Sequence, residues 1–239
     1  MTKQKVGTLH LIPVGLAPTP IETWLPAKAQ QQAGELTHYI AENAKTARAF
    51  LKLISLKHPI QEIDIQPLSN KTDDKTLKEW LAPLLSGLDI GLVSEAGCPA
   101  VADPGARVVA LAHSLALPVK PWVGPSSILL GLMASGLDGQ RFAFHGYAPV
   151  KPDERQRQLK HWEQLSARLS QTQILIETPY RNSAMLESML STLNPRTRLC
   201  IARDLSGTQE WIRTQTIAQW KQSDSPTLAG LPTLFLFQA

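Results

Sequence analysis

Short, largely apolar segments alternate with longer amphipathic stretches through the first half of the chain. Five of these segments are typical of β-strands, at residues 8–14, 36–41, 63–67, 89–94 and 119–123. Residues 46–54 and 73–85 place apolar side chains at helical spacing, and Thr-Asp-Asp-Lys at residues 72–75 is a helix start signal. Strands that alternate with crossover helices form parallel sheets. The pattern therefore predicts an α/β domain with a parallel-type sheet over residues 1–122.

The pattern changes after residue 122. Turn-forming residues there precede segments typical of a helix, a strand, a charged helix and a strand, at residues 127–134, 142–146, 151–168 and 173–177. Three further strands are expected at residues 198–203, 211–216 and 233–237. They lie too close in sequence for a helix between each pair, so some must be antiparallel. We expect a second α/β domain with a mixed sheet over residues 123–239, and a ligand cleft between the two domains.

Composition narrows the class of protein. The chain has 239 residues, of which 43% are hydrophobic and 18% charged, as in an ordinary folded protein. The sequence holds no apolar run approaching the ~20 residues that a membrane helix needs. The run at residues 9–12 is too short for a secretory signal. We therefore expect no membrane association and a cytoplasmic location.

Charge and cysteine content exclude little but favour some partners. The net charge of +4 is compatible with a polyanionic partner, although it is far from a dense nucleic-acid patch. Cys98 and Cys200 have no second cysteine or histidine at metal-ligand spacing. The sequence predicts two reduced thiols and no metal site.

The strongest candidate for chemistry is the stretch at residues 94–105. An apolar strand ends there in small residues, two carboxylates and two prolines. In open α/β sheets, ligands bind at the carboxyl ends of the strands. Glu95 is either a ligand-binding carboxylate or a solvated loop residue, whereas Asp103 is better placed to cap the following helix.

Other strand ends carry similar residues in the first half of the chain. Pro13, Val14 and Gly15 follow the first strand, where a glycine lets backbone approach a ligand, although a plain turn is the alternative. Glu42 and Lys45 follow the second strand and are either site residues or a solvated helix start. Both groups are expected at the same sheet edge as residues 94–97.

Strand ends in the second half of the chain carry similar residues. Glu177 ends a strand before a proline-started helix, and His145 ends another, where it serves either as a base or as a structural residue. Ser126 and Ser127 either cap a helix or face a ligand. Because no Gly-x-Ser-x-Gly elbow and no cysteine with a paired histidine occurs, spacing alone predicts a small-molecule site but not its chemistry.

A series of motifs across nearly the whole chain resembles the tetrapyrrole methylase superfamily. The motifs are Ser-Glu-Ala-Gly-Cys-Pro at 94–99, Ala-Asp-Pro-Gly at 102–105, Val-Gly-Pro-Ser-Ser at 123–127, Ala-Ser-Gly-Leu at 134–137, Phe-His-Gly-Tyr at 144–147 and Glu-Thr-Pro-Tyr-Arg at 177–181. They are most similar to the branch that methylates a cytidine ribose 2′-hydroxyl in small-subunit ribosomal RNA. The resemblance implies S-adenosylmethionine between two α/β domains, a homodimer, and ribosomal RNA or the small ribosomal subunit as partner.

The resemblance also assigns residues. The implied cofactor contacts are Pro13, Val14, Gly15, Ser94, Glu95, Ala96, Gly97, Val101, Ala102, Ser126, Ser127, Tyr180, Leu231, Pro232 and Thr233. Lys45 and Arg181 fall on the substrate side. A ribose hydroxyl must lose its proton during attack, and the candidate general bases are Glu42, Glu95, His145 and Glu177.

This chain departs from the branch at several positions. The branch carries Glu-Asp-Thr-Arg where residues 42–45 read Glu-Asn-Ala-Lys, an aspartate at the position of Glu95, Ile-Gly-Asn where residues 15–17 read Gly-Leu-Ala, and a longer carboxyl-terminal extension. The leading hypothesis is an S-adenosylmethionine-dependent methyltransferase acting on an RNA ribose. The alternatives are a methyltransferase for a small molecule such as a tetrapyrrole, and a catalytically silent protein that binds S-adenosylmethionine.

Overall fold

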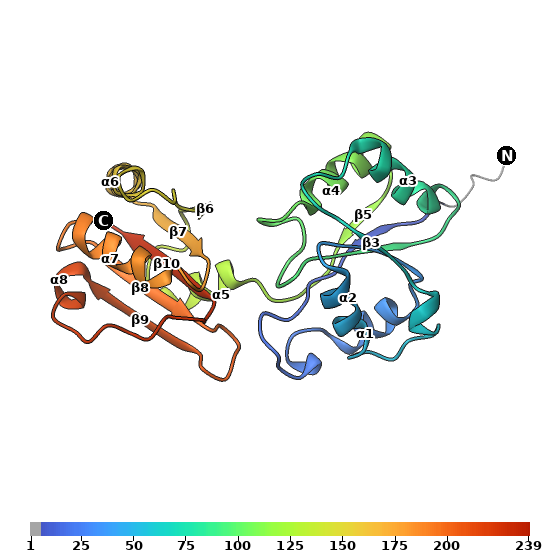
Figure 1. Ribbon diagram of the computed structural model, residues 1–239, viewed down its shortest axis with the longest axis horizontal. Coiled ribbons are helices and arrows are strands. Elements are labelled where there is room, and N and C mark those ends of the chain that lie inside the picture. The colour runs from blue at the N-terminus through green and yellow to red at the C-terminus, as the bar shows by residue number, and fades with distance from the viewer. Residues whose placement is uncertain (1–5) are drawn as a thin grey trace. The chain divides into compact units, whose positions relative to one another are not determined.

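The computed structural model describes residues 6–239, which form two compact units, Met1–Ser126 and Ser127–Ala239. The sequence-based boundary lies four residues earlier, between residues 122 and 123. Each unit contains a five-stranded sheet flanked by helices (Figure 1). The predicted α/β class, with a parallel first sheet and a mixed second sheet, is confirmed. No helix within residues 6–239 combines the length and the apolar character needed to cross a bilayer.

The first sheet is entirely parallel, with the strand order β3-β2-β4-β1-β5. Its strands are β1 (Leu9–Leu11), β2 (His38–Ala41), β3 (Asp64–Pro67), β4 (Ile90–Val93) and β5 (Val119–Pro121). The connecting helices are η1 (Ile21–Thr23), α1 (Ala27–Gly34), α2 (Ala44–Leu51), η2 (Ile60–Glu62), α3 (Asp74–Leu85) and α4 (Gly105–Ser114). The five strands match the predicted positions.

Both faces of this sheet are buried, because successive strand side chains point to opposite sides. Tyr39 and Val93 pack with α1 and α2 on one face, whereas Ile40 and Leu92 pack with α3 and α4 on the other. Figure 1 shows the two helix pairs on opposite sides of the sheet. The strands β1 and β2 thus lead into helices on one face, and β4 leads into a helix on the other.

That divergence opens the sheet edge where the site lies. Chains that leave neighbouring strands for opposite faces create a crevice at the carboxyl ends of those strands. In the first unit the crevice falls between β4 and its neighbours β1 and β2. The segments after these three strands are therefore the ones free to contact a ligand.

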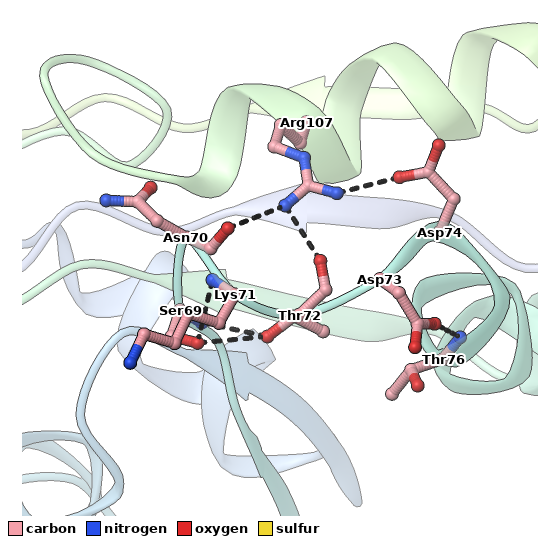
Figure 2. A network of polar contacts seen from close by, with 8 residues as sticks. All are labelled: Ser69, Asn70, Lys71, Thr72, Asp73, Asp74, Thr76 and Arg107. Carbon is pink, nitrogen blue, oxygen red and sulfur yellow. Dashed lines mark hydrogen bonds and ion pairs between the residues drawn. The ribbon is translucent and has the colours of Figure 1, made fainter.

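A network of polar contacts joins α3 and α4, which lie on the same face of the first sheet (Figure 2). The Asp73 carboxylate accepts the Thr76 amide at 2.8 Å and caps α3, as the start signal predicted. The Arg107 guanidinium of α4 donates to the Thr72 carbonyl at 2.8 Å and to the Asp74 carboxylate at 2.7 Å. The start of α3 is thereby tied to α4, which immediately follows residues 94–104.

The second unit holds a mixed sheet in the order β6-β7-β10-β8-β9, in which β6 and β7 are parallel and the other neighbours antiparallel. Its strands are β6 (Phe142–Tyr147), β7 (Thr172–Glu177), β8 (Arg198–Arg203), β9 (Trp211–Thr216) and β10 (Thr233–Gln238). Its helices are α5 (Ser127–Ser135), α6 (Pro152–Leu169), α7 (Asn182–Thr192) and α8 (Ile217–Trp220). Phe235 and Phe237 pack in the core with α6 and α7, while Leu234 contacts Gly131 of α5.

The middle of β4 tests how tightly the first sheet is packed. A Cβ added at Gly91 would lie 2.6 Å from Cε1 of the buried Tyr39 ring. We expect Gly91→Ala to lower the free energy of unfolding by about 1–3 kcal/mol, because overpacked cores shift side chains from their preferred rotamers. Urea denaturation measures the change. Gly139→Ala is the control, since an added Cβ there has no atom within 4 Å, and equal stabilities of the two variants would contradict the prediction.

Candidate functional site

A short antiparallel bridge joins the segments that follow β1 and β4. The Val14 amide donates to the Gly97 carbonyl at 3.0 Å, and the Gly97 amide donates to the Val14 carbonyl at 3.1 Å. Gly97 is buried with a φ of 72°, a conformation that glycine adopts at low cost. The predicted cofactor residues Pro13, Val14 and Gly15 therefore lie beside Ser94, Glu95, Ala96 and Gly97.

The segment between β4 and α4 is held by its own side chains. The Ser94 hydroxyl lies 3.2 Å from the Ala96 and Gly97 carbonyls. The Asp103 carboxylate accepts the Ala100 amide at 2.9 Å and the Gly105 amide at 2.6 Å. These bonds hold Ala100 and Ala102 at φ values of 67° and 62°, which non-glycine residues rarely adopt. Asp103 thus organises the loop as well as the start of α4.

Three carboxylates come together at this edge. Oε2 of Glu42 accepts the Glu95 amide at 3.4 Å, and the Asn43 side-chain amide donates to Oε1 of Glu95 at 2.9 Å. Burial raises the pKa of Glu42, and the negative charges of Asp103 and Glu95 raise it further. Burial also raises the pKa of Asp103 despite its two backbone hydrogen bonds. The predicted base candidates Glu42 and Glu95 therefore share one environment.

A hollow of about 450 Å³ opens beside the bridged segments. Its lining includes Val14, Gly15, Ser94 and Glu95, together with Trp24 and residues of α2. The Trp24 ring also packs against Gly15, where an added Cβ would lie 3.1 Å from the indole. Its volume is within the range of ligand pockets, ~300–1,000 Å³. Sequence reasoning did not identify Trp24 or the α2 side chains as lining residues.

The segment before α5 contacts the segments that follow β1 and β4. The Cys98 thiol donates to the Pro125 carbonyl at 3.3 Å, and a Cβ at Gly124 would collide with the Pro13 ring. Ser126, a predicted cofactor residue, follows Pro125 directly, and Ser127 begins α5 of the second unit. Val101 is exposed. Both cysteines are free thiols, as predicted.

In the second unit, Glu177 and Arg181 form an ion pair. The Arg181 guanidinium donates to Oε1 of Glu177 at 2.5 Å and 2.9 Å, and the Thr178 amide donates to the same oxygen at 2.7 Å. The Glu177 side chain is 1% exposed. A carboxylate engaged in this way stabilises the turn into α7 and is poorly placed to accept a substrate proton. Tyr180, in the same turn, is 81% exposed.

The predicted residues Leu231, Pro232 and Thr233 lie near this turn. Thr233 pairs with Glu177 across β10 and β7, and the Asn182 side chain donates to the Leu231 carbonyl at 2.8 Å and to the Thr233 hydroxyl at 3.0 Å. The Pro232 carbonyl accepts the Asp204 amide. The second unit therefore gathers Glu177, Tyr180, Arg181 and residues 231–233 around the start of α7.

His145 does not join that group. Its Nε2 lies 2.7 Å from Oε1 of Gln173, near the opposite end of β7 from Glu177. Its ring stacks on Trp162 with 4.3 Å between centroids, and burial lowers its pKa. These contacts agree with the structural alternative for this histidine rather than with general-base catalysis.

Comparison with known proteins identifies relatives of similar sequence. Residues of this chain are 29% identical to the ribosomal RNA small subunit methyltransferase I of Xylella fastidiosa over 214 residues, covering 89% of this chain and 73% of that protein. The protein of the same name from Vibrio cholerae is 37% identical over 136 residues, covering 57% and 46%. No family model matches the sequence.

These relatives support the resemblance of this chain to the tetrapyrrole methylase superfamily. Both are named for small-subunit ribosomal RNA, the branch that the motif series predicted. Several of those matches, including the Vibrio cholerae protein, span about half the length of the relative.

Solved structures of the superfamily share the fold. The methyltransferase CobJ aligns with a TM-score of 0.62 at 18% identity, covering 98% of this chain and 94% of that chain. The uroporphyrin-III C-methyltransferase of Thermus thermophilus aligns with a TM-score of 0.52 at 16% identity, covering 97% and 92%. At such identities the likeness establishes the architecture alone.

No group of three or more histidine, cysteine, aspartate or glutamate side chains within the described range is arranged to hold a metal. The expectation that this methylase uses no metal stays a prediction. So do the individual cofactor contacts assigned to its residues.

The ion pair between Glu177 and Arg181 allows a test of whether Glu177 has a structural or a chemical role. We expect Arg181→Met to lower the free energy of unfolding by about 3 kcal/mol or more, because it leaves the buried Glu177 carboxylate without its partner. Urea denaturation followed by tryptophan fluorescence measures it.

The matched control is Lys151→Met, which breaks the exposed pair with Glu154, whose side chains are 79% and 46% exposed. That variant should lose about 0–1 kcal/mol. If Arg181→Met lost no more stability than the control, Glu177 would be free for another role.

Proposed function

We propose that this chain transfers the methyl group of S-adenosylmethionine to a ribose 2′-hydroxyl of small-subunit ribosomal RNA. The observation that carries the proposal is the bridge between Val14 and Gly97, which places two loops of small residues beside an open hollow that Glu95 lines. The names of the relatives support the reaction and the substrate. The mild net charge of +4 is compatible with an RNA partner.

The residues after β1 and β4 fit the proposed cofactor. Val14, Gly15 and Ser94 line the hollow with small side chains, and the bridge holds their segments together. When bound, S-adenosylmethionine supplies a methyl group on a sulfonium and becomes a neutral thioether after transfer. The predicted contacts in the second unit, at Ser127, Tyr180 and residues 231–233, remain part of this proposal.

Glu42 is the best-placed general base among the four candidates. A base works best when its pKa lies near the working pH, and burial together with the neighbouring charges of Asp103 and Glu95 raises the pKa of Glu42. Glu177 and His145 are engaged in structural contacts. Glu42 would accept the hydroxyl proton as the ribose oxygen forms its bond to the methyl carbon and the carbon–sulfur bond breaks.

Positioning supplies much of the remaining rate. Methyl transfer is an in-line displacement, and holding two reactants in line is worth up to ~7–11 kcal/mol. The bonds of Ser94 and Asp103 within the loop keep the β4 segment rigid for that purpose. Lys45, exposed at the start of α2, is the proposed contact for an RNA phosphate.

The small-molecule alternative has weaker support. The solved structures of CobJ and of a uroporphyrin-III C-methyltransferase share the fold at 18% and 16% identity, whereas the relatives named for ribosomal RNA share 29–37%. The homodimer implied by the family resemblance and the cytoplasmic location expected from the sequence belong to the proposal.

The main test has two measurements. Calorimetric titration should show S-adenosylmethionine binding at a stoichiometry of one per chain. Mass spectrometry of small-subunit RNA from a strain that lacks the gene should show one ribose methyl missing, which the purified protein restores in vitro. Absence of binding would refute the methyltransferase, and a full set of ribose methyls in the deletion strain would refute the RNA substrate.

Glu42→Gln separates chemistry from stability. We expect the rate of methyl transfer to fall by about 10²- to 10⁴-fold, the usual contribution of a general base, while the dissociation constant for S-adenosylmethionine stays unchanged. Single-turnover assays measure the rate.

The same variant should be more stable than wild type at neutral pH. Because the folded pKa of Glu42 is raised, the folded state binds its proton more tightly, and Glu42 costs stability as pH rises above about 4.5. The advantage of the glutamine should vanish in acid, where Glu42 is protonated in both states. Glu62→Gln, at an exposed position, is the control; equal activity of the two variants would remove Glu42 from catalysis.

A further inference from the structure

The residues that line the hollow fall into two sets. Val14, Gly15 and Ser94 belong to the proposed cofactor contacts. Trp24, Phe50 and Leu53 carry no proposed cofactor contact, and the Trp24 ring packs beside Gly15. Methyl transfer requires the acceptor to lie directly against the donor. The second set is therefore in the right place for part of the acceptor.

The second set of residues is aromatic and apolar. The Trp24 and Phe50 rings lie 6.2 Å apart between centroids at an interplanar angle of 45°. Trp24 is partly buried, Leu53 is 55% exposed, and Phe50 supports them from the core at 4% exposure. A partly exposed aromatic ring such as that of Trp24 is a platform on which an unstacked nucleobase binds.

A row of positive charges runs along the same helix. Lys45 and Arg48 of α2 and Lys52 at its end are all exposed and are spaced three and four residues apart, which places them on one helical face. Residues that line the hollow come directly after these cations in the sequence. Thr46 follows Lys45, Ala49 and Phe50 follow Arg48, and Leu53 follows Lys52. Residues 44–52 include no acidic side chain. None of the three cations has an ion-pair partner within 4.0 Å among residues 6–239.

From this juxtaposition we infer that the hollow between Trp24, Phe50 and Leu53 receives an unpaired nucleobase of the RNA acceptor, while Lys45, Arg48 and Lys52 contact the phosphates of the same strand. Sequence-tolerant binding of single strands combines these two elements, a basic track and a stacking surface. The inference rests on the proposed function and adds the binding mode of its substrate. It assigns roles to Trp24, Phe50, Leu53, Arg48 and Lys52.

Two variants test the two elements separately. Ala49→Trp fills the hollow from an exposed position on α2, so it leaves the core intact. The triple variant Lys45→Ala, Arg48→Ala, Lys52→Ala removes the basic row. Its matched control, Lys71→Ala, Lys75→Ala, Lys78→Ala, removes three exposed positive charges at and near the start of α3, on the opposite face of the sheet.

Fluorescence anisotropy measures binding of a single-stranded oligocytidine RNA of about 12 nucleotides and of an abasic strand of equal length. Wild type should bind the oligocytidine about tenfold or more tightly than the abasic strand, and Ala49→Trp should abolish that preference without weakening abasic binding. The basic-row variant should weaken both strands and flatten the plot of log affinity against log salt by about 2, since each single-strand phosphate contact contributes ~0.7. The α3 control should leave the salt slope within about 0.5 of wild type.

Several outcomes would overturn the inference. An unchanged base preference in Ala49→Trp would show that bases bind elsewhere. A loss of S-adenosylmethionine binding in Ala49→Trp, with RNA binding unchanged, would assign the hollow to the cofactor. If the α3 control flattened the salt plot as much as the basic-row variant, the basic row would contribute only through the net charge of the protein.

These readouts also separate the inference from the function on which it rests. If wild type methylates small-subunit RNA and Ala49→Trp does so with an unchanged KM, the binding mode is wrong and the function stands. If wild type binds the strands as described and methylates no RNA, the function is wrong while the strand-binding surface stands.

Discussion

Two hydrogen bonds between Val14 and Gly97 hold the candidate site together. The strands β1 and β4 pair in register only through Leu11 and Leu92, and beyond that point their chains leave for opposite faces of the sheet. The bridge closes the gap between the departing segments, and it needs Gly97 in a left-handed conformation with a φ of 72°. Because Gly15 follows Val14 and packs on Trp24, the bridge also positions one wall of the hollow. The small residues that looked like room for a ligand are equally the residues that permit this pairing.

The fold was largely predictable because hydrophobic periodicity distinguishes strands from helices over most of the chain. β8 and β9 have the expected bounds, and β8 is a continuous apolar run of four residues between two arginines. β1 is shorter than expected, since Pro13 lacks an amide for the ladder. The helix α1 was not identified individually, because the glutamines at 30–32 interrupt any apolar period. This helix packs on the core through Ala33, together with the neighbouring Leu25 and Leu36.

The site was predictable in part, for a related reason. Topology brings the carboxyl ends of β1, β2 and β4 to one edge, so the polar residues after those strands were found from their positions alone. Trp24 and Phe50 carried no such signal, since an aromatic residue in an amphipathic stretch resembles a core residue; Phe50 is one, at 4% exposure, whereas Trp24 is only partly buried. The engagement of Glu177 was also hidden. Arg181 precedes α7 rather than following Glu177 within a helix, so helical spacing rules did not apply to the pair.

The environments of the carboxylates separate structure from chemistry. Glu177 is buried against a guanidinium and backbone amides, an arrangement that stabilises its charge and leaves it no capacity for proton transfer. Burial disfavours the charge of Glu42 and raises its pKa, the Glu95 amide at 3.4 Å offsets part of this effect, and the charges of Asp103 and Glu95 add to it. The surrounding loop adds strain through Ala100 and Ala102. A fold selected for stability alone would relieve these costs, whereas a site that must accept a proton needs a carboxylate whose charged form is disfavoured. The unfavourable terms therefore concentrate around Glu42, the proposed general base, on the edge where three loops converge.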